Sequence, residues 1–80
     1  MKIQLIQGHF SAADAIDIVT RMVHAKIKFH EDKIYDDSGE ETIKMRETRI
    51  KQLQKDLFDL RRQIESSKGM IDIQAEMTVA

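Results

Sequence analysis

Three histidines could bind a metal ion or transfer a proton near neutral pH. His24 and His30 lie six positions apart in a segment with helical periodicity, which separates them by about 240° around a helix axis. Two ligands on one helix must share a face to reach the same ion, so this pair predicts no metal site. We expect His30 to be a packed or interfacial side chain, and His9 lies in a different segment.

A cluster of oxygen-bearing side chains between residues 36 and 41 has the composition of a hard-cation loop. Its members are Asp36, Asp37, Ser38, Glu40 and Glu41. Their spacing differs from the regular ligand spacing of an EF-hand loop. Ser38 followed three residues later by Glu41 is instead the capping-box pattern that begins a helix. We therefore predict a turn and a helix start here, without a metal ion.

Basic side chains offer a third kind of chemistry, the binding of an anion. The candidates are Arg21, Lys28, Arg61 and Arg62. The sequence contains no Ser/His/Asp set, Gly-rich phosphate loop or paired-carboxylate motif, so we predict no catalytic residue, cofactor or small-molecule substrate. The alternative is a small enzyme or anion-binding protein that uses these basic residues in an intersubunit cleft.

One segment resembles part of a known enzyme family. The stretch from Ile16 to Lys33, with Arg21, Met22 and Lys28 inside it, is similar to the first helix of all-helical chorismate mutases. That family holds a dianionic substrate with spaced arginine and lysine residues, so the resemblance implies binding of such a substrate. It covers less than a third of the chain, its basic residues are spaced differently, and the two strands predicted below are foreign to that fold.

Size and composition bound the class of protein. The 80 residues carry a net charge of -1, with acidic and basic residues interleaved, so we expect no nucleic-acid partner and no membrane partner. Hydrophobic residues make up 41% and charged residues 34%, which is typical of a folded helical domain. We expect one domain over residues 1–80. Because cysteine is absent and neither a signal-peptide nor a membrane-spanning pattern is visible, we expect a cytoplasmic protein.

The longest regular pattern lies between residues 43 and 64. Apolar residues recur there at alternating intervals of three and four, which predicts a helix over residues 40–68 that packs along one partner helix. The stripe consists of Ile43, Ile50, Leu53, Leu57, Leu60 and Ile64. Arg46 occupies one core-type position. We favour a packed stem with a solvated head for Arg46, over a pair with an acid across the interface that would fix register.

A second helix is predicted over residues 11–34. Ser11 followed by Asp14 is a capping-box-like start. One apolar stripe comprises Ile16, Val19, Val23, Ile27 and Ile34; the other comprises Ala15, Ile18, Met22, Ala25 and Phe29. The two stripes lie about 120° apart, so one neighbouring helix cannot cover both. This helix should therefore have two neighbours.

Alternating apolar residues predict strands over residues 1–7 and 70–79. Ile6 breaks the first alternation, and Gly8 is expected to mark the strand's end or a bend. Gly69 is expected to provide a left-handed stop after the second helix. With a loop over residues 35–39, the fold class is a predominantly helical α+β protein, strand–helix–helix–strand, with a long antiparallel hairpin and an antiparallel terminal ribbon.

A hairpin and a ribbon of this size bury a small core for their surface, so we expect a symmetric homodimer built around a four-helix bundle. The predicted function is a small non-enzymatic assembly or protein-interaction module, acting as a homo-oligomer or as a subunit with another protein partner. The predicted interface residues are Ile18, Met22, Ala25, Phe29, Ile50, Leu53, Leu57, Leu60 and Ile64.

Overall fold

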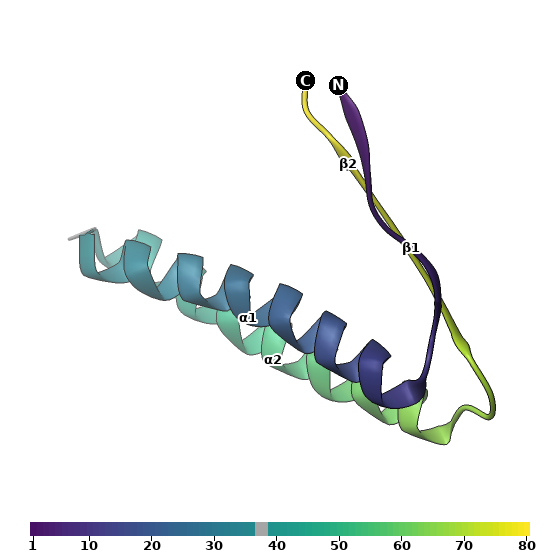
Figure 1. Cartoon of the computed structure of the whole chain (residues 1–80). Coiled ribbons are helices and arrows are strands. Elements are labelled where there is room, and N and C mark those ends of the chain that lie inside the picture. Colours follow the sequence, from purple (N-terminus) through teal and green to yellow (C-terminus); the bar gives the residue numbers. More distant parts are fainter. Residues whose placement is uncertain (37–38) are drawn as a thin grey trace.

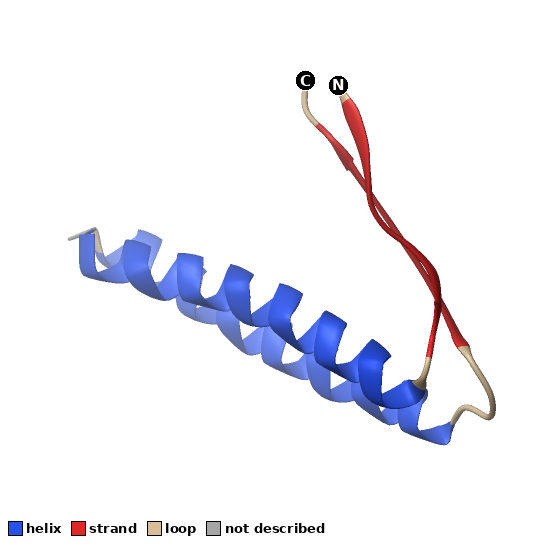
Figure 2. Ribbon diagram, viewed as in Figure 1, coloured by secondary structure: helices blue, strands red, loops and turns tan. Residues whose placement is uncertain are grey.

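The computed structural model describes residues 1–36 and 39–80, which form two strands and two helices (Figure 1). The elements are β1 (Lys2–Phe10), α1 (Ala12–Asp36), α2 (Glu40–Ser66) and β2 (Ile71–Thr78). The helices form a hairpin, and β1 pairs antiparallel with β2 (Figure 2). The predicted strand–helix–helix–strand topology is confirmed.

Helix α1 begins as its sequence predicts. The Ser11 hydroxyl accepts a hydrogen bond from the backbone N–H of Asp14 at 3.2 Å, and the Ser11 carbonyl accepts one from Ala15 at 2.8 Å. The hydroxyl thereby satisfies one of the N–H groups that have no partner within the first helical turn. The start of α2 was predicted on Ser38, which lies outside the described residues.

Helix α2 ends at Ser66, before the predicted end at residue 68. The hydroxyls of Ser66 and Ser67 both donate to the carbonyl of Gln63, at 2.9 and 2.8 Å. They stabilise a carbonyl near the helix end, where intrahelical partners run out. Gly69 has φ of 85°, the left-handed conformation expected of it, but it lies in the turn before β2 rather than at the end of the helix.

The break in alternation at Ile6 is a β-bulge. The register shifts between Gln4 and Ile6, so that Leu5 is the extra residue in β1. Because of this shift, Ile3 and Ile6 lie on the same side of the ribbon although they are three residues apart. The bulge also lets β1 continue to Phe10, three residues past the predicted end, and Gly8 is a strand residue opposite Ile73.

The bulge gives the ribbon one apolar side, here called the ribbon face. It consists of Ile3, Ile6, Phe10, Ile71, Ile73, Ala75 and Met77, which are brought together by the cross-strand register. The opposite side consists of Lys2, Gln4, Gln7, His9, Asp72, Gln74, Glu76 and Thr78. An antiparallel ribbon with this division needs another layer against its apolar side.

The core of the hairpin lies along the predicted contact line. Leu57 and Ile64 of α2 and Ala15 and Ile27 of α1 are buried. The other apolar residues of the α2 stripe are half-buried, except Leu60, which is exposed at the edge of the contact. Two helices in contact along one line can bury only a narrow strip of each, and the core is correspondingly small.

The whole chain is one layer thick. Its dimensions are 47 × 32 × 13 Å, and the smallest is close to the diameter of a single helix. Figure 1 shows the ribbon rising away from the hairpin, with both termini at its far end. Packed domains ordinarily contain at least two layers. Contact between the ribbon and α1 is confined to the base of the ribbon.

Candidate functional site

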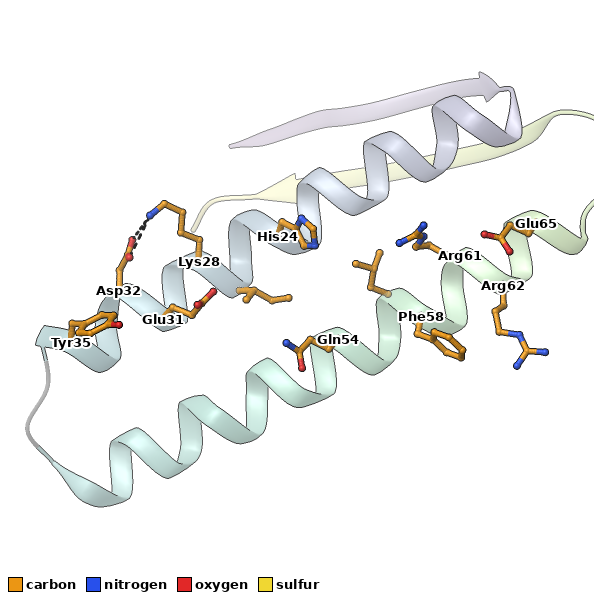
Figure 3. Close-up of a pocket in the computed structure, with 12 residues that line it drawn as sticks. His24, Lys28, Glu31, Asp32, Tyr35, Gln54, Phe58, Arg61, Arg62 and Glu65 are labelled. Atoms are coloured by element: carbon orange, nitrogen blue, oxygen red, sulfur yellow. Dashed lines mark hydrogen bonds and ion pairs between the residues drawn. The ribbon is translucent and has the colours of Figure 1, made fainter.

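One side of the hairpin carries a groove of about 950 Å³ between α1 and α2 (Figure 3). Ile27 and Leu57, both buried, lie at its base. Its walls contain His24, Lys28, Glu31, Asp32, Tyr35, Gln54, Phe58, Arg61, Arg62 and Glu65. Residues four and seven apart on each helix recur in this set, so the groove follows one face of the hairpin along its length.

The charges of the groove are mixed in sign. Lys28 Nζ lies 3.3 Å from Asp32 Oδ2, and the Arg62 guanidinium lies 5.7 Å from the centre of the Phe58 ring. Figure 3 shows Arg61 directed toward α1 and Arg62 directed away from it. Three basic and three acidic residues line the groove, so no strong field of one sign develops that would draw in a small anion.

The four basic residues of the anion-binding alternative do not all converge. Lys28, Arg61 and Arg62 line the groove, whereas Arg21 does not. Arg21 Nε donates to Asp17 Oδ1 at 3.0 Å on an exposed part of α1. Such exposed pairs, four residues apart, stabilise a helix by only tenths of a kcal/mol.

The three histidines lie in three different environments. His24 lines the groove, His9 Nδ1 lies 4.0 Å from Asp72 Oδ1 on the polar side of the ribbon, and His30 lies between the helices. Among residues 1–36 and 39–80, no group of three or more His, Asp or Glu side chains is placed to hold a metal ion. Asp37 and Ser38 of the predicted acidic turn lie outside the described residues.

His30 and Arg46 form a polar contact across the hairpin. Arg46 Nη1 lies 3.0 Å from His30 Nδ1, and the Arg46 guanidinium lies 5.8 Å from the centre of the Phe29 ring. His30 also stacks edge-on against Phe29, with 5.6 Å between ring centres. The pKa of His30 is lowered, first by partial burial and then by the positive charges of Arg46, Lys26 and Arg49.

Both sequence-based interpretations of Arg46 need correction. Its head turns onto His30 and Phe29 instead of extending into water, and its partner is an imidazole rather than an acid. The acidic residues next to His30, Glu31 and Asp32, line the groove and therefore lie on another face of α1. Within the described part of the chain, Arg46 Nε is a buried nitrogen without a hydrogen-bond partner.

The second apolar stripe of α1 is largely open to solvent. We call Ile18, Met22, Ala25 and Phe29 the α1 stripe. Met22 is 39% and Phe29 53% exposed, Ala25 is also exposed, and Ile18 is half-buried. The stripe and the ribbon face are two apolar surfaces that the hairpin contact leaves uncovered. The interface residues predicted from the sequence all lie on the helices. The alternation in β2 already predicts its half of the ribbon face, whereas the bulge at Leu5 breaks the alternation in β1 and hides the other half.

Comparison with known proteins assigns the chain to no family. No family model matches the sequence, and neither a curated protein nor a solved structure matches it. In the described residues, neither helix has a stretch long and apolar enough to cross a membrane.

Proposed function

We propose that this chain is a non-enzymatic assembly module that works as a homo-oligomer. The observation that carries the proposal is the thinness of the chain, 13 Å, combined with two uncovered apolar surfaces. A single layer exposes on one side what a packed domain buries between two layers. Association with a further chain supplies the missing layer.

The accessible surface area and the radius of gyration of the chain support the same proposal. The chain exposes 6365 Å², whereas a compact monomer of 9.3 kDa exposes about 5,000 Å². Its radius of gyration is 15.1 Å, against about 12 Å for a compact domain of this length. The excess surface is about 1,400 Å² for each chain, which is in the range that obligate homodimers bury.

Anion binding remains the second candidate, because Lys28, Arg61 and Arg62 do share the groove. The mixed charges of the groove support anion binding less well than the open apolar surfaces support assembly. Calorimetric titration with inorganic phosphate distinguishes the two candidates. Assembly alone predicts no saturable heat, and a saturable signal lost in Arg61→Gln would favour the anion-binding candidate.

Thermal unfolding at several chain concentrations tests the assembly proposal. Because association stabilises the folded state by mass action, a hundredfold rise in chain concentration should raise Tm by at least about 5 °C. A cooperative transition whose Tm stays constant from about 1 to about 100 μM would contradict the homo-oligomer. The midpoint should be followed at the same heating rate throughout, so that irreversible losses do not imitate a shift.

A further inference from the structure

The two uncovered apolar surfaces lie on different elements of the chain. On the ribbon face, Ile3 is 42% and Met77 44% exposed, and these two residues are directly opposite each other near the free end of the ribbon. On the hairpin, the α1 stripe exposes Met22 and Phe29. Neither surface contains a charged residue. The nearest printed charges are Lys33 and Arg46, each 5.8 Å from the centre of the Phe29 ring, so the rest of the stripe can be buried without removing these ions from water.

At its base the ribbon face borders the first turns of α1, where Val19 rather than a residue of the α1 stripe faces it. A hollow of about 310 Å³ there is lined by Val19 and Leu60 from the helices and by Ile71 and Ile73 from β2. Val19 follows Ile18 in the sequence and lies about one turn from Met22, so the ribbon leaves the hairpin at the N-terminal end of the α1 stripe. The groove is on another side of α1, because His24 and Met22 are about 200° apart around the helix axis.

Four symmetric ways of adding a second copy can be compared by what each would cover. Pairing of ribbon edges extends the sheet but leaves its apolar side open. A four-helix bundle covers the α1 stripe and leaves the ribbon face open, whereas stacking of two ribbons does the reverse. Placing the ribbon of each copy on the α1 stripe of the other covers both surfaces, and it is self-complementary, as a two-fold interface must be.

The lengths of the two surfaces are also compatible. From Ile71 to Met77 the ribbon face extends about 20 Å. From Ile18 to Phe29 the α1 stripe extends about 16 Å along the helix. Because Ile71 and Ile73 at the base already border Val19 and Leu60 of the same chain, the outer part of the ribbon is the part that is free to lie on the stripe of a partner.

We propose that a second copy of this chain occupies this face, with the ribbon of each copy packed on the α1 stripe of its partner around a two-fold axis. The inference rests on the proposed function, since it names the partner and the contact through which assembly occurs. It replaces the helix bundle of the sequence-based expectation with an exchange of ribbons. The groove is left on the outside of the dimer.

Single cysteines test this arrangement, because the chain has none of its own and one thiol per chain can link only different chains. A Met22→Cys chain labelled with heavy nitrogen and an unlabelled Met77→Cys chain are unfolded together, refolded and treated with a short bis-maleimide. The proposal expects the mixed product to dominate in denaturing mass spectrometry. As a matched control, a mixture of Phe58→Cys, on the groove, with Met77→Cys should give a yield of mixed product that is at least about tenfold lower.

The remaining outcomes separate the inference from the proposed function. Products that join two Met22→Cys chains indicate a helix bundle, and products that join two Met77→Cys chains indicate stacked ribbons. Either result as the dominant one overturns the exchange of ribbons but leaves assembly standing. An assembled sample without mixed product overturns the exchange as well. A folded sample that is monomeric by light scattering and yields no product contradicts both proposals.

Discussion

Arg46 Nη1 lies 3.0 Å from His30 Nδ1, across the interface between α1 and α2. Arginine can only donate, so this contact requires His30 to be neutral, with Nδ1 as the acceptor. The pair lies toward the connection between the helices, whereas the buried Leu57 and Ile64 lie toward the ribbon. The hairpin thus has a polar contact between its helices toward one end and buried apolar side chains toward the other.

The first prediction concerns pH. The pKa of His30 is lowered in the folded chain, so the unfolded state binds more protons in the pH range between the two values. The stability that the neutral imidazole contributes is complete above about pH 6.5 and is lost as pH falls through the lowered folded value. Denaturant unfolding between about pH 7.5 and about pH 5 should therefore show a midpoint that decreases on acidification.

Two glutamine substitutions test whether His30 causes this decrease of the unfolding midpoint with pH. His30→Gln keeps a hydrogen-bond acceptor opposite Arg46 but does not titrate, so the decrease should become smaller. His24→Gln, in the groove, should leave the slope unchanged. An unaltered slope in His30→Gln would show that the Arg46 contact does not depend on a neutral imidazole.

The second prediction concerns the hairpin core. Leu57 is 7% exposed, and Leu57→Ala should reduce the free energy of unfolding by about 2–5 kcal/mol, because it removes a buried side chain and leaves a cavity. Tyr35→Ala is the matched control, since Tyr35 is 90% exposed and its loss should cost less than about 1 kcal/mol. Equal losses in equilibrium denaturation would refute the assignment of Leu57 to the core.

The third prediction concerns the bulge. Deleting Leu5 should change the free energy of unfolding by less than about 1 kcal/mol, because the extra residue is removed and every apolar residue of β1 stays on the ribbon face. Deleting Gln74 from β2 should be much more damaging, since a one-residue slip moves either Ile71 and Ile73 or Ala75 and Met77 to the polar side. Comparable melting temperatures for the two deletions would contradict the register.

The fold could be predicted from the sequence where the determining contacts are local. Ser11 and Asp14 mark a helix start within one turn, and the intervals between Ile50, Leu57 and Ile64 define a helical contact line without reference to its partner. The two stripes of α1 likewise predicted that one helix could not cover it. Each of these inferences uses residues on a single element.

The features that were missed depend on two elements at once. The bulge at Leu5 is visible only through the pairing of Ile3 with Met77 and of Ile6 with Ala75. The partner of Arg46 depends on how α2 is rotated against α1, which no periodicity specifies. The direction of the ribbon depends on the two connections at its base, from β1 to α1 and from α2 to β2. For these reasons, the β1 half of the ribbon face could not be derived from the sequence, whereas alternation alone predicts the apolar side of β2.

The fourth prediction concerns the α1 stripe. Met22→Asp should split the assembly, because an unpaired carboxylate in a dry interface is costly, and Met22 is exposed enough in the single chain to tolerate the charge. Gln54→Asp places the same carboxylate on the groove and should leave the mass in solution unchanged. If both variants keep the native mass, the stripe does not lie in the interface.

The mass of the unmodified chain in solution tests the central claim most directly. Light scattering coupled to size-exclusion chromatography at micromolar concentration should give twice the chain mass of 9.3 kDa. Far-ultraviolet circular dichroism of the same fraction should show that it is predominantly helical. A stable, folded species of 9.3 kDa would contradict the account, because its two apolar surfaces would then remain in water without a partner.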